Sequence, residues 1–79
     1  MGIYGDNLAT VIAQQLRAER AAAGLTHKEL AERAGLKEQS VIRYLTEKRD
    51  IDTPTLGALC DALNLTPQEL VVRAVDRIK

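Results

Sequence analysis

Side chains that could support catalysis or bind a metal are scarce in this 79-residue chain. The single histidine, His27, has no cysteine near it, and the single cysteine, Cys60, can form neither an internal disulfide nor a metal cluster. Cys60 also falls on the apolar stripe of a predicted helix, which favours a buried thiol over a reactive one. No glycine-rich phosphate loop follows a strand, because no strand is predicted. The sequence therefore indicates a protein that is not an enzyme and needs no cofactor.

Polar side chains suited to recognition gather instead between Leu25 and Arg49. This stretch predicts two short helices joined by a tight turn. Thr26 and Glu29 have the spacing of a capping box, in which each side chain satisfies a backbone N–H of the other residue. Gly35 supplies the left-handed residue that ends a helix without a steric clash. The first helix of the unit is therefore predicted to begin after Thr26 and to end before Gly35.

The second helix of the unit is predicted over residues 38–45. Its buried face should consist of Val41, Tyr44 and Leu45. Its opposite face carries Glu38, Gln39, Ile42 and Arg43. Two helices that cross at about 90–120° over a short turn need a small residue at the crossing. Ala31 meets that requirement.

This arrangement resembles the helix-turn-helix family of phage repressors and Cro proteins. The resemblance covers about residues 12–70 and rests on Ala31, Gly35 and Val41 at these spacings, flanked by the segments LT–ELA and ALNLTPQEL. It implies an all-α fold: a compact five-helix bundle similar to the DNA-binding domain of lambda repressor. The helix-turn-helix unit would span residues 26–45.

In this family the second helix of the unit enters the major groove of double-stranded DNA, with its N-terminal residues against base edges. The resemblance therefore implies base reading by Glu38, Gln39, Ile42 and Arg43. Gln39 can form two hydrogen bonds with adenine, and Arg43 can bind guanine or a phosphate. An exposed Ile42 suits a thymine methyl group, and Glu38 suits the amino group of cytosine. The alternatives are that Ile42 packs on the helix edge and that Glu38 only stabilises the helix dipole.

The resemblance also implies contacts between backbone phosphates and a set of basic residues: His27, Lys28, Lys37, Lys48 and Arg49. His27 stands where the family usually has a glutamine that anchors both the helix and a phosphate, and an imidazole N–H can donate one such bond. The alternative for His27 is a solvated histidine in the first turn. For Lys48 and Arg49 the alternative is a pair of solvated loop charges.

Three positions depart from the family pattern. The second helix of the unit is called the recognition helix in this family. Family members often pair an arginine of the domain's first helix, which precedes the unit, with a glutamate near the end of the recognition helix. Arg20 matches the arginine but Leu45 replaces the glutamate, so Arg20 needs another partner, such as Glu47 or Asp50, or stays solvated. Glu47 stands where a glycine is usual, which leaves the turn geometry open. Lys37 stands where a Ser or Thr cap is common.

The rest of the chain predicts three more helices around this unit. A loose tail is expected over residues 1–5, because Gly2 and Gly5 flank the pair Ile3 and Tyr4. A long helix should follow to residue 23, with Asp6 as its cap and Gly24 as its left-handed end. Another helix is predicted over 53–63, with Thr53 as its cap and a proline at the first helical position. The last helix should begin after Thr66, within a second capping box.

The last predicted helix carries an apolar stripe that is too wide for one side of a small bundle to bury. Val71 and Val75 lie one turn apart, while Val72 lies about 100° around the helix from Val71. We therefore expect Val72 to be exposed. Since this family pairs two copies on DNA, the resemblance implies a homodimer on a palindromic operator, with Val71, Val72 and Val75 at the interface. The alternative is that this helix only covers the core of a monomer.

Charge and hydropathy limit the possible partners. The net charge is zero, and residues 26–49 hold six basic and four acidic residues, so a phosphate-binding face would be small. No apolar run reaches membrane length, and the first residues lack the features of a signal peptide. We expect a cytoplasmic single domain over residues 1–79, with no membrane partner and no small-molecule ligand.

The leading prediction is a sequence-specific DNA-binding transcriptional regulator. It would be a small repressor or Cro-like protein of a phage or mobile element that occupies an operator and excludes polymerase. The alternative is a protein-binding module, such as an antirepressor or antitoxin-like partner, that uses the fold without reading DNA. The zero net charge and Glu38 on the reading face favour that alternative, whereas the combination of motifs favours the regulator.

Overall fold

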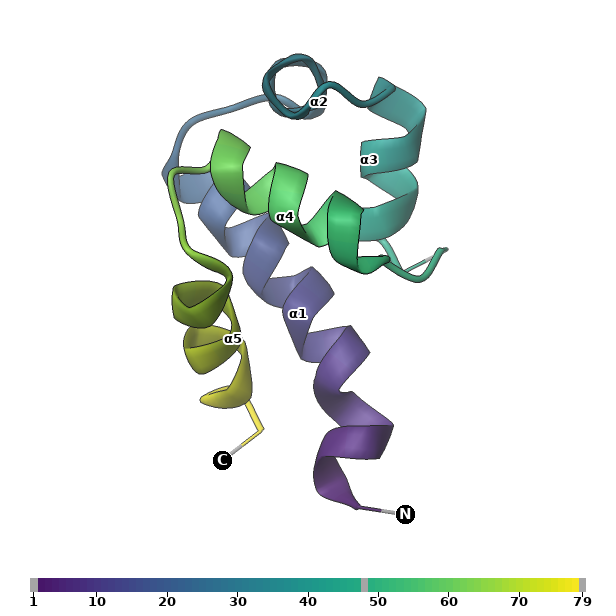
Figure 1. Cartoon of the computed structure of the whole chain (residues 1–79), viewed down its shortest axis with the longest axis vertical. Coiled ribbons are helices and arrows are strands. Elements are labelled where there is room, and N and C mark those ends of the chain that lie inside the picture. Colours follow the sequence, from purple (N-terminus) through teal and green to yellow (C-terminus); the bar gives the residue numbers. More distant parts are fainter. Residues whose placement is uncertain (1, 48, 79) are drawn as a thin grey trace.

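The computed structural model of the protein describes residues 2–47 and 49–78. These residues form five helices and no strand: α1 (Ile3–Ala22), α2 (His27–Ala34), α3 (Glu38–Leu45), α4 (Thr53–Ala62) and α5 (Pro67–Val75). α1 follows the long axis of the molecule and α4 crosses in front of it, while α2 and α3 lie at the opposite end from the two termini (Figure 1). The predicted all-α fold with five helices is confirmed for the described residues.

α1 begins earlier than the sequence predicted. The expectation of a loose tail over residues 1–5 is wrong for the described part of that segment, because the helix begins at Ile3. A glycine inside a helix costs only about 1 kcal/mol, so Gly5 does not interrupt α1. Asp6, predicted as the cap, lies in the first turn, where its charge interacts favourably with the helix dipole. Gly24 follows the other end with a left-handed φ of 70°, as predicted.

Side-chain caps set the starts of α4 and α5. Thr66 Oγ1 accepts from the Glu69 N–H at 3.1 Å and Glu69 Oε1 accepts from the Thr66 N–H at 3.0 Å, which is the predicted capping box. α4 is capped by Asp52 rather than by the predicted Thr53, because the Asp52 carboxylate accepts from the Thr55 N–H at 2.8 Å. A carboxylate is a stronger acceptor than a hydroxyl. Hydrogen bonds from Thr55 lower the pKa of Asp52, and those from Thr66 lower the pKa of Glu69.

The core is aliphatic, because the chain contains no Phe or Trp. Each helix contributes one fully buried leucine: Leu16, Leu30, Leu45, Leu59 and Leu70. Val41 and Cys60 are fully buried beside them. The burial of Cys60 raises the pKa of its thiol, which confirms the prediction of a buried core thiol.

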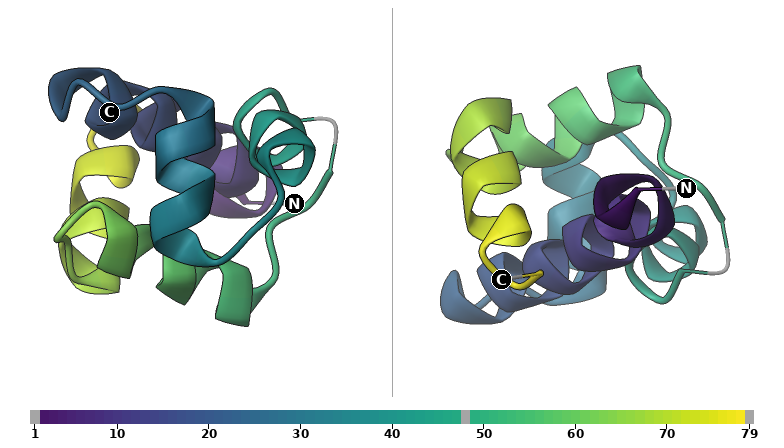
Figure 2. Two further views of the ribbon diagram at one scale, coloured as in Figure 1. Left: turned by 90° about the horizontal axis from the view of Figure 1, so that it is seen from above. Right: turned by 90° about the horizontal axis from the view of Figure 1, so that it is seen from below.

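α5 packs against α1 (Figure 2), and polar contacts from α5 and from the turn after it join the two. Arg73 Nη1 donates to Glu19 Oε2 at 2.8 Å, and Arg77 Nε donates to Gln15 Oε1 at 2.8 Å. Burial raises the pKa of Glu19, but the hydrogen bonds from Arg73 and Gln15 outweigh it, so the net shift is downward. These contacts join residues 54 and 62 positions apart, so they close the last helix onto the first.

The first turns of α1 contribute little to this core. No side chain of α1 before Val11 is buried, and both Ile3 and Tyr4 are 54% exposed. Figure 1 shows this end of α1 extending past α4, at the end of the molecule where both termini lie. The helix-turn-helix unit at the opposite end is therefore positioned by the second half of α1, not by the first.

Candidate nucleic-acid interface

α2 forms the first half of the candidate interface. Thr26 Oγ1 accepts from the Glu29 N–H and Glu29 Oε1 accepts from the Thr26 N–H, both at 3.0 Å, so the predicted capping box is present. These bonds lower the pKa of Glu29. Gly35 ends the helix with a φ of 70°, and Ala31 is only 2% exposed, as the crossing requires. Seen from above, α2 and α3 cross steeply (Figure 2).

α3 presents the face that was predicted to read bases. Its buried face is as predicted: Val41, Tyr44 and Leu45. Glu38, Gln39 and Arg43 are exposed on the opposite face, whereas Ile42 is half-buried rather than exposed. Glu38, Gln39 and Ile42 line one shallow hollow on the helix surface. α3 therefore offers an apolar spot flanked by a carboxylate and an amide, with a guanidinium nearby.

The predicted phosphate-binding residues of α2 and α3 lie at the starts of the two helices. Lys28 and Lys37 are exposed and His27 is half-buried. Lys37 is the N-cap of α3 and makes no side-chain cap hydrogen bond, as its departure from the family pattern predicts. Lys48, which was also predicted to bind phosphate, lies outside the described residues.

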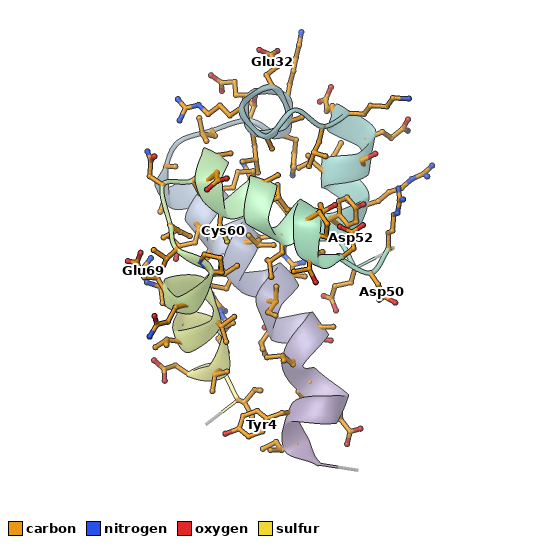
Figure 3. The ribbon with its side chains drawn as sticks, viewed as in Figure 1. Tyr4, Glu32, Asp50, Asp52, Cys60 and Glu69 are labelled. Carbon is orange, nitrogen blue, oxygen red and sulfur yellow. The ribbon has the colours of Figure 1, made fainter. Side chains whose placement is uncertain are left out.

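Arg49 follows α3 and is exposed. Its guanidinium carbon lies 5.2 Å from the centroid of the Tyr44 ring. A cation over an aromatic face gains about 0.5–1 kcal/mol at an exposed site, so this contact holds the charge beside the end of α3. Two carboxylates, Asp50 and Asp52, lie on the same connection (Figure 3), so the positive surface here is narrow.

The described residues contain no group of three or more His, Cys, Asp or Glu side chains that could hold a metal ion. No helix in this part of the chain has both the length and the apolar character needed to cross a membrane. Within this part of the chain, the polar residues for which the sequence predicts a function are therefore those of α2, α3 and the connection after α3.

Comparison with known proteins agrees with this geometry. A family model described as helix-turn-helix matches residues 16–70. The chain belongs to the XRE-like helix-turn-helix DNA-binding family. The match begins within α1 and ends within α5, so it includes the whole of α2, α3 and α4.

The helix-turn-helix fold is also found in two crystal structures of the clp gene regulator ClgR from Corynebacterium glutamicum. Each shares 22% sequence identity with this chain at a TM-score of 0.84. One similarity covers 91% of this chain and 94% of that chain, and the other covers 90% and 76%. At this identity the likeness concerns the fold alone. The comparison with curated protein sequences gave no match.

Arg20 has a different partner in this helix-turn-helix protein from those considered on the sequence. Instead of the carboxylate of Glu47 or Asp50, Arg20 Nη1 reaches the backbone carbonyl of Leu25 at 2.5 Å. Its Nε is buried and has no hydrogen-bond partner among the described residues. Arg20 therefore secures the connection between α1 and α2 rather than the end of the recognition helix.

Arg17, which the sequence analysis did not single out, contacts the end of the recognition helix. Its Nη1 donates to the backbone carbonyl of Leu45 and lies 3.7 Å from Glu47 Oε2. Arg17 precedes Arg20 by three residues and so lies on nearly the same face of α1, which is the signal that could have identified it. Because a backbone carbonyl is the acceptor, position 45 needs no carboxylate and Leu45 can join the core.

Glu47 takes the left-handed conformation that suits the glycine usual at this position. Its φ is 64°, and this conformation costs about 1–2 kcal/mol for a residue with a Cβ atom. The ion pair with Arg17 joins two side chains that are each 39% exposed. Such a surface pair contributes at most about 1 kcal/mol. The ion pair therefore does not fully offset the cost of the left-handed backbone, and Glu47 remains strained.

We expect Glu47→Gly to be more stable than Glu47→Gln by about 1 kcal/mol, because both remove the charge and only glycine relieves the left-handed strain. Urea unfolding of the two variants and the wild type measures the difference. The glutamine variant is the matched control, since its difference from the wild type reports the ion pair alone. Equal stability of the two variants would show that position 47 is not strained.

The residues predicted for a dimer interface lie on α5. Val72 is 55% exposed, which confirms the predicted exposure. Val71 and Val75 are half-buried. Their part in a dimer stays a prediction.

Proposed function

We propose that this chain is a sequence-specific transcriptional regulator that acts by occupying an operator. The observation that carries the proposal is the exposed polar face of α3: Glu38, Gln39 and Arg43 stand on a helix whose other face is fixed in the core. Membership of a DNA-binding helix-turn-helix family supports it. Further support comes from the fold shared with ClgR, a clp gene regulator.

In the proposed complex α3 lies in the major groove, and the residues near its N-terminus contact the base edges. Gln39 would form two hydrogen bonds with adenine, and Arg43 would bind guanine. The hollow would accept a thymine methyl group beside Ile42, the one apolar residue that lines it. Glu38 would accept a hydrogen bond from the amino group of cytosine.

A small set of cations would hold the DNA backbone: His27, Lys28, Lys37, Lys48 and Arg49. Because the set is small and carboxylates lie near it, we expect weak binding by one copy. We therefore propose a homodimer on a palindromic operator, with Val71, Val72 and Val75 of α5 at the interface. A small phage or mobile-element repressor or Cro-like protein of the cytoplasm fits these features.

A protein-binding module is the second candidate function. The observation that favours it is the number of outward carboxylates on the unit: Glu38 is exposed on the reading face, and Glu32 points outward from α2 (Figure 3). Carboxylates near phosphates are repelled, and the zero net charge of the chain gives no compensating attraction. An antirepressor or antitoxin-like partner would use this surface to bind a basic protein.

An electrophoretic shift on random-sequence duplexes at two salt concentrations separates the two functions. A DNA-binding regulator should retard the duplexes at the lower salt concentration and lose most of that binding at the higher one. No shift at either concentration would contradict the proposed function and favour the protein-binding module.

Substitutions should separate base contacts from phosphate contacts. Gln39→Ala or Arg43→Ala should relax the preference at one base-pair position, with a loss of about 1–3 kcal/mol per good bidentate contact. Lys28→Ala or Lys37→Ala should weaken binding to all sequences alike and lower the salt slope by about one. Binding-site selection and salt titrations measure these effects, with Arg33→Ala as a control for an exposed cation outside the predicted set. Equal losses on specific and random DNA for all four variants would contradict the assigned roles.

A further inference from the structure

The carbonyls at the end of α3 are satisfied in two different ways. The last four carbonyls of a helix have no partner within the helix itself. Thr46, which follows α3, donates to the carbonyl of Ile42 through its N–H at 2.9 Å and through its hydroxyl at 2.7 Å. The carbonyl of Leu45, the last residue of α3, instead accepts from Nη1 of Arg17, a side chain of α1. A residue of the first helix therefore caps the recognition helix.

Arg17 also holds the turn that follows α3. The same Nη1 atom lies 3.7 Å from Oε2 of Glu47, the residue with the left-handed φ of 64°. A guanidinium carries several N–H donors in a planar, fixed fork, so it can hold two acceptors at once in one geometry. It is also a cation at the negative end of a helix dipole, where a positive charge is favourable. One side chain of α1 thus ties together the last residue of α3 and the connection to α4.

The apolar contacts between α1 and α3 do not set the direction of α3 by themselves. Leu16 and Leu45 are fully buried in one core, but the hydrophobic effect that holds them there is non-directional. A hydrogen bond depends steeply on its angle, so the bond from Arg17 restricts the tilt of α3 as well as its distance from α1. At its other end α3 follows the turn after α2, where the Leu36 N–H donates to the Ala31 carbonyl at 2.9 Å. α3 is therefore held at its start by α2 and at its end by α1.

The two proposed bidentate base contacts lie toward opposite ends of α3. Gln39 lies in the first turn, close to α2, while Arg43 lies two residues before Leu45, close to the contact with Arg17. A bidentate contact requires two donors or acceptors to be in place at once, and a misplacement of about 1 Å is enough to weaken it. Loss of the Arg17 contact should therefore disturb the base contact of Arg43 more than that of Gln39.

We propose that Arg17 is a positioning residue for base recognition. By holding the Leu45 carbonyl and the Glu47 carboxylate, it fixes the C-terminal half of α3 and sets the selectivity for the base pair that Arg43 reads. In this role Arg17 acts through α3 and does not itself bind DNA. The inference rests on the proposed function and adds to it a residue that lies outside the helix-turn-helix unit. The side chain of Arg17 is 39% exposed, so its removal should leave the fold intact.

Amide hydrogen exchange of the free protein tests the structural half of this proposal. Arg17→Met keeps a long side chain and removes its donors and its charge. The amides of Leu45 and Thr46 should exchange at least about fivefold faster in this variant, because a hydrogen bond from a charged group at the end of α3 is lost. The amides of α2 should be unchanged. Arg33→Met, which removes another arginine at an exposed position, is the matched control. Unchanged exchange in Arg17→Met would overturn the proposal whatever the variant does on DNA.

Affinities for a selected operator and for its single base-pair variants test the functional half. The alanine variants of Gln39 and Arg43 assign a base pair to each residue. Arg17→Met should lose at least about fivefold of the discrimination at the base pair assigned to Arg43, and should retain the discrimination at the base pair assigned to Gln39. Affinity for random duplexes and the salt slope should match the wild type, because no phosphate contact is removed. Arg17→Lys should restore part of the discrimination, since an ammonium keeps the charge and a donor.

The possible outcomes separate this proposal from the proposed function. A salt slope lowered by about one would show that Arg17 binds a phosphate, and would overturn the positioning role. Equal losses at both base pairs would also overturn it, since they would report a general loosening of the fold. If Arg17→Met melts far below the wild type, Arg17→Lys carries the same comparison with smaller expected losses. Failure of the wild type to bind any duplex would overturn the proposed function, while amide exchange would still decide whether Arg17 holds the end of α3.

Discussion

The double variant Ala31→Leu with Gly35→Val should leave little folded protein. Ala31 is 2% exposed at the crossing of α2 and α3, so a leucine would force the helices apart at a cost of about 1–3 kcal/mol. Gly35 has a φ of 70°, where a β-branched residue costs at least about another 1–2 kcal/mol. Together these losses would remove much of the roughly 5–15 kcal/mol that holds a small domain folded.

Thermal and urea unfolding followed by circular dichroism measure this loss. The cost at Gly35 should come from the backbone alone, because a Cβ atom there would meet nothing within 4 Å. Gly35→Asn is therefore the informative control, since asparagine tolerates the left-handed conformation. Ala22→Leu controls for a larger side chain at an exposed position. Near-native melting of the double variant would show that the helix crossing does not depend on these two residues.

Val72→Glu should weaken binding to a palindromic operator by roughly 5- to 150-fold, the usual range for coupling between two sites. The glutamate would place two like charges at the centre of the proposed α5 contact, so each copy would bind alone. The monomer should stay folded, because Val72 is 55% exposed. Affinity for an isolated half-site should not change, because α3 is untouched.

Fluorescence anisotropy on full and half operators measures both affinities, and the full operator needs half-site centres about 34–36 Å apart. Ala22→Glu is a suitable control, since it adds the same charge at an exposed position of α1. A complex of one protein with one half-site, with the same affinity for wild type and Val72→Glu, would rule out the α5 contact.

Local signals made much of the helix-turn-helix unit predictable. The limits of α3 agree with the sequence, and α2 begins directly after the Thr26 cap and ends before Gly35. Capping boxes and left-handed glycines act over a single turn, so they can be recognised without knowledge of the tertiary structure. The burial of Val41 and Tyr44 followed from helical spacing in the same way.

Features that depend on packing between distant residues could not be predicted. The spacing from Arg20 could have singled out Arg17, but its acceptor could not be predicted, because the carbonyl of Leu45, 28 positions away, belongs to the backbone and has no side-chain signal in the sequence. The half-burial of Ile42 depends on its surroundings in the folded chain and not on its spacing within α3. The early start of α1 was missed because Gly2 and Gly5 argue against a helix, although a glycine costs a helix only about 1 kcal/mol.

The left-handed backbone of Glu47 bears on how readily this protein could acquire a new operator. Proteins tolerate substitutions only while their stability stays above the level that folding requires. New side chains at exposed base-reading positions of α3 would each change stability by only up to about 0.5 kcal/mol, so relief of the left-handed strain at position 47, about 1–2 kcal/mol, would offset several of them. Glu47→Gly thus provides a background in which changes at Gln39 and Arg43 could be selected for recognition alone. In a lineage that keeps the glutamate, several such changes made together would have a smaller margin of stability in which to accumulate.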